Sequence, residues 1–79
     1  MQKIEILGPG CARCKQTYRV IHHVVEQDGL PFEVVKEESH ARMSALNVLA
    51  TPAVAVDGKV VLSGRVPSAE QVRTLLRTA

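Results

Sequence analysis

Aromatic residues are nearly absent from this 79-residue sequence, which has no Trp, one Tyr and one Phe. The core must therefore be aliphatic, and few rings are available to stack on nucleic-acid bases. The sequence also lacks a large excess of charge of one sign, because ten Lys and Arg against eight Asp and Glu leave a net charge of only +2. We therefore expect no nucleic-acid partner.

Long apolar runs are missing as well. No stretch approaches the roughly 18 apolar residues that a membrane-spanning helix needs, so we expect no membrane partner. The sequence opens on a strand-like segment and not on a charged, then apolar, leader, so we expect no secretory signal. Because 46% of the residues are hydrophobic, a core is feasible, and we expect one monomeric, cytoplasmic domain over residues 1–79.

Cysteine is scarce too, since Cys11 and Cys14 are the two that the sequence contains. Any internal disulfide must join this pair. In the cytoplasm a disulfide is more often catalytic or regulatory than structural. A ring this short would also restrict the unfolded chain less than a long loop, which weakens a purely structural role. The pair therefore indicates a redox dithiol that cycles between thiol and disulfide.

Both cysteines lie where an apolar strand is expected to pass into a helix. Residues 3–7 have a strand pattern, Gly-Pro-Gly at 8–10 stops it, and a helix is expected from about residue 11 to residue 28. A thiol in the first turn of a helix lies among unpaired backbone N–H groups at the positive end of the helix dipole. Both features favour the thiolate, which is the reactive form.

The rest of the sequence adds three strands and two helices. We expect strands over residues 32–36, 53–56 and 60–62, a short helix with Ser39 as its N-cap, and a last helix that opens with a capping box of Ser68 and Gln71. Asp-Gly at 57–58 is a strong β-hairpin signal. The order β-α-β-α-β-β-α predicts an α/β fold, in which a parallel βαβ unit and an antiparallel hairpin form a four-stranded mixed sheet with helices on both faces.

This order, with Cys-Ala-Arg-Cys at 11–14 and Thr-Pro at 51–52, resembles the thioredoxin-like fold in its minimal, glutaredoxin-sized form. The sequence is similar over essentially its whole length to the small redox-active disulfide proteins, in the segments Gly-Pro-Gly-Cys, Thr-Pro-Ala, Val-Asp-Gly-Lys and Gly-Arg-Val-Pro-Ser. The resemblance implies a thiol–disulfide oxidoreductase that reduces protein disulfides. It implies no cofactor or metal, and recycling by an upstream reductase or a small thiol.

The resemblance also implies residue roles. Cys11 would be the exposed nucleophile that attacks a substrate disulfide, and Cys14 the more buried thiol that resolves the mixed disulfide. Pro52 would be a cis proline beside the disulfide. The chain would turn there so that the Thr51 backbone pairs with an extended substrate segment.

The sequence departs from the family pattern at three places. Gly10 stands where most thioredoxins have a Trp, and Ala12-Arg13 replaces the Gly-Pro or Pro-Tyr pair between the cysteines. Gly64 is retained from the Gly-Gly-x-Asp segment with which many glutaredoxins bind glutathione, but the aspartate is missing, which weakens the case for glutathione. Gly64 and Arg65 either border the substrate groove, with Arg65 binding an anionic group, or Arg65 is a solvated loop residue.

Glu5 has two interpretations. It lies six residues before Cys11, where thioredoxins carry a buried aspartate that assists proton transfer to the resolving cysteine. Burial at that position would raise the pKa of the Glu5 carboxyl. Glu5 also fits, with Lys3, the polar face of an alternating strand, and we favour this second interpretation because buried glutamates are rare.

Several other polar residues have a simpler interpretation as surface or packing residues. His22 is eight residues from Cys14, about 12 Å along a helix, which is too far for both to share one metal ion. We interpret Tyr18 as a core residue. The remaining candidates are expected on the solvated surface: His22, His23, His40, Glu33, Lys36, Glu37 and Glu38.

Two other classes of function stay open. Cys11 and Cys14 could hold Cu(I) or Zn in a soft-metal binding module, although small copper chaperones have a βαββαβ order. The disulfide could instead gate a partner interaction in a redox sensor without turnover. Multiple-turnover reduction of a test disulfide distinguishes catalysis from sensing.

Overall fold

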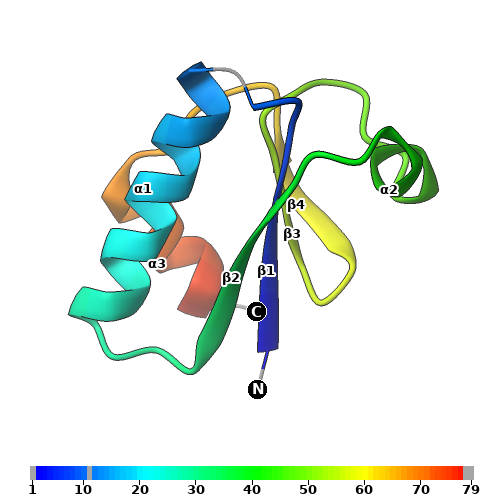
Figure 1. Ribbon diagram of the computed structural model, residues 1–79. Helices are drawn as coiled ribbons and strands as arrows, with labels where there is room; N and C mark the ends of the chain where they lie inside the picture. The colour runs from blue at the N-terminus through cyan, green and yellow to red at the C-terminus, as the bar shows by residue number, and fades with distance from the viewer. Residues whose placement is uncertain (1, 11, 78–79) are drawn as a thin grey trace.

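A four-stranded sheet lies at the centre of the computed structural model, which describes residues 2–10 and 12–77 (Figure 1). The strands are β1 Gln2–Leu7, β2 Phe32–Glu37, β3 Ala53–Val56 and β4 Lys59–Ser63. Their order in the sheet is β2-β1-β3-β4. β1 is parallel to β2 and antiparallel to β3, and β3 is antiparallel to β4, so the predicted mixed sheet is confirmed.

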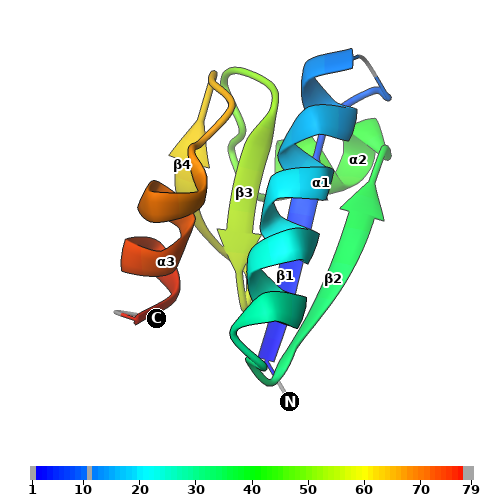
Figure 2. The same ribbon diagram turned by 90° about the vertical axis from the view of Figure 1, so that its left-hand side faces the viewer.

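Helices cover both faces of this sheet, as predicted. They are α1 Ala12–Gln27, α2 His40–Ala45 and α3 Ala69–Arg77. α1 and α3 pack together on one face, and α2 lies on the other, behind the sheet in Figure 2. The element order β-α-β-α-β-β-α agrees with the order expected from the sequence.

The sheet separates two apolar clusters, both built without buried aromatic rings. The cluster under α1 and α3 contains Ile4, Ile6, Ile21, Val24, Val25, Val54, Val56, Val72 and Leu76. The cluster under α2 contains Leu7, Met43, Ala53 and Ala55. β1 contributes to both clusters because alternate side chains of a strand point to opposite faces. A polar side chain on this doubly covered strand therefore needs a partner within the protein.

Turn and cap residues define the ends of several elements. Asp57 and Gly58 have φ angles of 50° and 83°, the two positive values that a type I′ hairpin turn requires. The Ser68 backbone N–H donates to Gln71 Oε1 at 3.0 Å, and the Gln71 N–H donates to Ser68 Oγ at 3.2 Å. Ser39 caps α2 by accepting a backbone N–H of its first turn. The predicted hairpin, capping box and N-cap are all present.

The expected bounds of the elements agree closely with those observed. β4 extends one residue beyond the expected 60–62 at each end. α1 ends at Gln27, followed by Gly29 with a φ of 61°, while the start of the expected helix, residue 11, lies outside the described residues. No helix within the described ranges is long and apolar enough to cross a bilayer.

Candidate functional site

Cys14 lies in the first turn of α1 and is only 6% exposed. Its sulfur packs so closely against the loop that leaves β1 that a Cβ added at Gly8 would collide with the Cys14 Sγ. Glycine is therefore required at position 8 by the close approach of a side chain. Cys11, the predicted nucleophile, lies outside the described residues, so its position and role stay predictions.

The first turn of α1 carries positive charge and no negative charge of its own. It contains no acidic residue, and Lys15 follows Cys14 directly. Backbone N–H groups at the start of a helix and the positive end of its dipole both stabilise an anion. These features favour the thiolate of a cysteine in this turn.

Two of the predicted substrate residues, Thr51 and Pro52, lie near this thiol, and a third, Gly64, is hydrogen-bonded to Pro52. The Thr51–Pro52 peptide bond is cis, and Pro52 is buried. A Cβ at Gly8 would lie 3.8 Å from the Thr51 Cβ, so the loop after β1 and the segment before β3 meet beside Cys14. The Gly64 N–H donates to the Pro52 carbonyl at 2.9 Å, which brings the end of β4 to the same edge.

Arg65, the fourth predicted substrate residue, is exposed and lies in a different place. It lines a surface groove between β4 and α3 together with Leu62, Gln71 and Leu75. Among the described residues, this groove shares no lining residue with the cavity beside Cys14. Arg65 therefore lines a different hollow from Cys14, and both interpretations of its role stay predictions.

A cavity of about 240 Å³ opens beside the Cys14 thiol. It is lined by Ile6, Gly8, Pro9, Gly10, Cys14, Lys15, Lys36 and Glu38. Lys36 and Glu38 are exposed, as predicted for charges at the end of a strand, yet they also border the thiol cavity. Local sequence patterns did not indicate this second property. Parallel pairing of β1 and β2 could have indicated it, because parallel strands end at the same edge of a sheet.

Lys36 is oriented by an aromatic side chain of α1. Its Nζ lies 4.6 Å from the centroid of the Tyr18 ring, within the range of a cation–π interaction. Tyr18 packs partly buried against the larger apolar cluster and stacks on His22, with ring centroids 5.5 Å apart. The ring thus contributes to packing, as predicted, and also holds a cation on the cavity side of β2.

The histidines do not gather around the cysteine. His23 and His40 are exposed, as expected, whereas His22 is half-buried and lies 3.2 Å from the carboxylate of Glu26. Within residues 2–10 and 12–77, no group of three or more His, Cys, Asp or Glu is placed to hold a metal ion.

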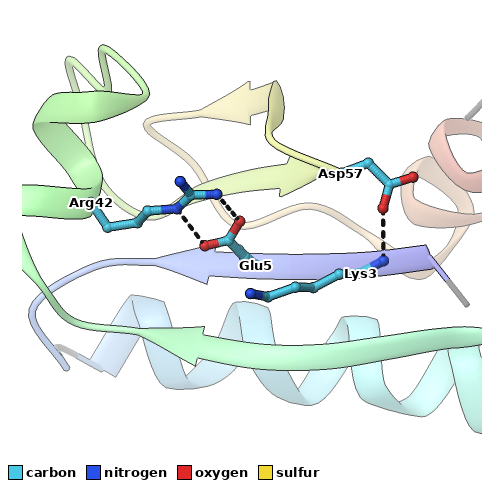
Figure 3. Close-up of polar contacts among 4 residues, drawn as sticks. All are labelled: Lys3, Glu5, Arg42 and Asp57. Carbon is cyan, nitrogen blue, oxygen red and sulfur yellow. Dashed lines mark hydrogen bonds and ion pairs between the residues drawn. The ribbon is translucent and has the colours of Figure 1, made fainter.

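Glu5 is 2% exposed, so the favoured interpretation of a solvated polar face is wrong. Its side chain lies on the α2 side of the sheet, where Arg42 reaches it (Figure 3). Arg42 Nε donates to Oε2 at 2.9 Å and an Arg42 Nη donates to Oε1 at 2.8 Å. A glutamate on this strand can be buried because a guanidinium satisfies both carboxylate oxygens.

Pairing with Arg42 also lowers the pKa of Glu5, whereas burial alone would raise it. Hydrogen bonds from Arg42 lower the pKa of the Glu5 carboxyl below its ordinary value, and they outweigh the opposing effect of burial. The charges of Arg42 and Lys3 act in the same direction as the hydrogen bonds. The sequence could not reveal this partner, because Arg42 lies 37 residues away on another element.

Comparisons with known proteins agree with this architecture. The family model of the thioredoxin domain matches residues 2–77. A thioredoxin of Methanocaldococcus jannaschii is 36% identical over 78 residues, covering 99% of this chain and 90% of the relative. A thioredoxin of Methanothermobacter thermautotrophicus is 33% identical over 76 residues, covering 96% of this chain and 99% of the relative.

A solved structure supports the same fold at lower sequence similarity. The solution structure of oxidised thioredoxin from Plasmodium falciparum superposes with a TM-score of 0.68, covering 98% of this chain and 79% of that one. At 16% identity, this likeness shows the fold alone.

Proposed function

Because the chain belongs to the thioredoxin family, we propose that it is a thiol–disulfide oxidoreductase whose redox dithiol is Cys11 and Cys14. The observation that carries the proposal is the placement of Cys14. Its thiol is buried in the first turn of α1, against Gly8 and near the cis Thr51–Pro52 peptide. A thiol in such a place is kept from solvent, as the more buried, resolving thiol of the pair would be.

The proposed reaction transfers two electrons to a substrate disulfide in two exchange steps. The Cys11 thiolate attacks one substrate sulfur, a Cys11–substrate disulfide forms, and the substrate S–S bond breaks to release one substrate thiolate. Cys14 then loses its proton and attacks the Cys11 sulfur. The Cys11–Cys14 disulfide forms, the mixed disulfide breaks, and the second substrate thiolate leaves. The substrate is reduced and the dithiol is oxidised.

We propose that the substrate is an extended segment of a disulfide-containing protein. Thr51 is half-buried, and its backbone precedes β3 at the edge where Gly64 meets Pro52. An extended chain could add to such an edge through main-chain hydrogen bonds. Reduction of proteins in the cytoplasm would require an upstream reductase or a small thiol to restore the dithiol.

The test is a redox titration of metal-free protein in dithiol/disulfide buffers, with Cys11 and Cys14 followed by alkylation and mass. We expect a reversible two-electron transition with a midpoint of about −200 to −300 mV. Absence of an internal disulfide, combined with tight Cu(I) or Zn binding, would instead support the metal-module alternative. A reversible disulfide without multiple turnover would support the sensor.

Single cysteine variants test the two roles. Cys14→Ser should accumulate a stable mixed disulfide with a protein substrate, because the resolving thiol is absent. Cys11→Ser should fail to react with the substrate, because Cys14 is buried. Mass spectrometry of the trapped adducts measures both, and stable trapping by Cys11→Ser would show that the roles are reversed.

A further inference from the structure

The resolving step requires a proton acceptor that the reaction above does not identify. Cys14 is 6% exposed and must lose its proton before it attacks. Glu5 is unsuited to accept that proton. Both of its carboxylate oxygens accept hydrogen bonds from Arg42 on the α2 side of the sheet, and Glu5 does not line the cavity at Cys14.

Glu38 lines the same cavity as the Cys14 thiol. Its Oε2 would be 2.9 Å from a Cβ built on Gly10, so the carboxylate is against the end of the loop that precedes α1. The Cys14 Sγ packs against the other end of the same loop, at Gly8. Thiol and carboxylate therefore border one cavity from opposite ends of the segment 8–10.

The cavity is large enough to connect the two groups through water. A water molecule occupies about 30 Å³ in the liquid, so a volume of about 240 Å³ has room for several. Proton transfer through one water is within the reach expected of a general base. A carboxylate at the mouth of the cavity can also exchange its proton with solvent, because Glu38 is exposed.

Other charged groups around this cavity do not compete for the role. Lys15 and Lys36 line it, but an ammonium group has donors and no acceptor, so it can stabilise a thiolate only by its charge. The neighbouring Glu37 carboxylate accepts the backbone N–H of Ser39 at 3.0 Å. Of the described residues that line the cavity, Glu38 is the one carboxylate.

We propose that Glu38 accepts the proton of Cys14, through water in this cavity, when Cys14 resolves the mixed disulfide. The inference rests on the proposed exchange function. The Cys14 S–H bond breaks and the carboxylate takes the proton, while the sulfur forms its bond to Cys11 and the substrate thiolate leaves. Glu38 then passes the proton to that thiolate or to solvent, which restores the carboxylate.

The sign of one substitution distinguishes this role from a mere charge effect. A nearby carboxylate disfavours a thiolate, so a Glu38 that acted only by its charge would slow resolution, and Glu38→Gln would speed it. A Glu38 that accepts the proton speeds resolution, and Glu38→Gln slows it. The two roles therefore predict opposite changes in the rate of the same step.

The experiment mixes reduced protein with an aromatic disulfide, dithiobis(nitrobenzoate), in a stopped-flow absorbance measurement. The first nitrothiophenolate is released when Cys11 attacks, at a rate proportional to the reagent concentration. The second is released when Cys14 resolves the adduct, at a rate independent of that concentration. Nitrothiophenolate is a stable anion that leaves without a proton, so the second phase reports the deprotonation of Cys14.

For Glu38→Gln we expect the second phase to be slowed by about tenfold or more. General base catalysis typically contributes about 10²–10⁴-fold, so the loss of the carboxylate should be easy to detect. Its rate should also rise more steeply with pH, because hydroxide must replace the carboxylate. Glu38→Asp should recover part of the rate. The matched control is Glu33→Gln, an exposed glutamate of β2 that does not line the cavity, and its second phase should be unchanged.

Glu38→Ala provides a second test, because added acetate can enter the cavity and accept the proton. We expect acetate to accelerate the second phase of Glu38→Ala and to leave the wild-type phase unaffected. A second phase in Glu38→Gln that is unchanged or faster would overturn the proposal. The proposal would also be overturned if the second phase of Glu38→Gln were slower but kept the wild-type dependence on pH, and acetate did not accelerate Glu38→Ala. Failure of wild type to show two phases would instead refute the exchange function itself.

Discussion

At the scale of single residues, two buried groups on neighbouring parts of the fold are stabilised in different ways. The Cys14 thiol lies at the positive end of α1, next to Lys15 and a solvent-connected cavity. The Glu5 carboxylate is 2% exposed and is paired through two hydrogen bonds with Arg42. The first group would change its protonation state in the proposed reaction, whereas the pKa of the second is lowered by Arg42, which keeps it an anion with a structural role.

Arg42→Met should destabilise the protein at pH 7 by more than a surface ion pair contributes. It leaves a buried carboxylate without its partner, and the 39% exposure of the Arg42 side chain keeps the effect below that of a fully buried pair. Chemical denaturation measures the difference. Arg73→Met is the matched control, because the Arg73–Asp28 pair is about one-third exposed on both sides and should contribute at most about 1 kcal/mol.

The same pair gives a pH dependence with a definite sign. Because the pKa of Glu5 is lowered by folding, the stabilisation is present above the ordinary value of 4.5 and is lost as pH falls through the lower native value. Wild type should therefore lose stability below about pH 4.5, and Glu5→Gln should lose less. Equal acid sensitivity of the two proteins in denaturation curves between pH 7 and pH 3 would contradict the assignment.

At the scale of elements, local sequence signals predicted the fold well. The capping box at Ser68 and the hairpin signal at Asp57-Gly58 depend on neighbours in the chain, so the sequence contains all the information they need. The burial of Glu5 and the position of Glu38 beside the thiol cavity depend on which elements pack together. Neither the α2 partner of β1 nor the cavity beside α1 is visible in a local pattern.

The β3–β4 hairpin is tied to β1 by its turn residue. Asp57 Oδ1 accepts the Lys3 backbone N–H at 2.9 Å, as Figure 3 shows, and Oδ2 accepts Gln2 Nε2 at 3.1 Å. Asp57 also has a φ of 50°, a conformation that Asp and Asn adopt more readily than other residues with a side chain. One side chain thus joins the turn to the start of the central strand.

Asp57→Ala should destabilise the protein by about 1–2 kcal/mol, since it removes both hydrogen bonds and places Ala at a positive φ. Asp57→Asn should cost less, because Asn tolerates this φ and keeps an oxygen acceptor. Urea unfolding of the two variants measures the difference. Equal losses would show that the hydrogen bonds to β1, and not the conformation of the turn, determine the effect.

At the scale of the whole molecule, the candidate site is formed where several distant segments meet at one edge of the sheet. The loop 8–10, the start of α1, Glu38 after β2, the cis Thr51–Pro52 peptide and Gly64 after β4 all lie there. The topology accounts for this, because β1 and β2 end at this edge and β3, antiparallel to β1, begins there. Resemblance to a known family pointed to Cys14, Thr51, Pro52 and Gly64, whose roles stay predictions. It did not indicate that Lys36 and Glu38, at and after the end of β2, border the same cavity as Cys14.

Gly64 connects the proposed substrate edge to the rest of the sheet. It donates to the Pro52 carbonyl at 2.9 Å, has a φ of 84°, and would place a Cβ 3.3 Å from the Ala50 Cβ. Gly64→Ala should therefore push apart β4 and the segment before Pro52. We expect slower reduction of a protein disulfide, several-fold more affected than reduction of a small aromatic disulfide, because only the protein substrate needs the backbone edge.

Gly58→Ala is the matched control for that variant. Gly58 has nearly the same φ, 83°, but a Cβ there would meet nothing within 4 Å, and it lies in the hairpin turn at the opposite end of β3 from Pro52. Both variants should lose similar stability from backbone strain, about 1 kcal/mol. Only Gly64→Ala should change the ratio of the two reduction rates. If both variants change this ratio equally, the preference for one substrate over the other depends on overall stability. The edge at Gly64 is then not where protein substrates bind.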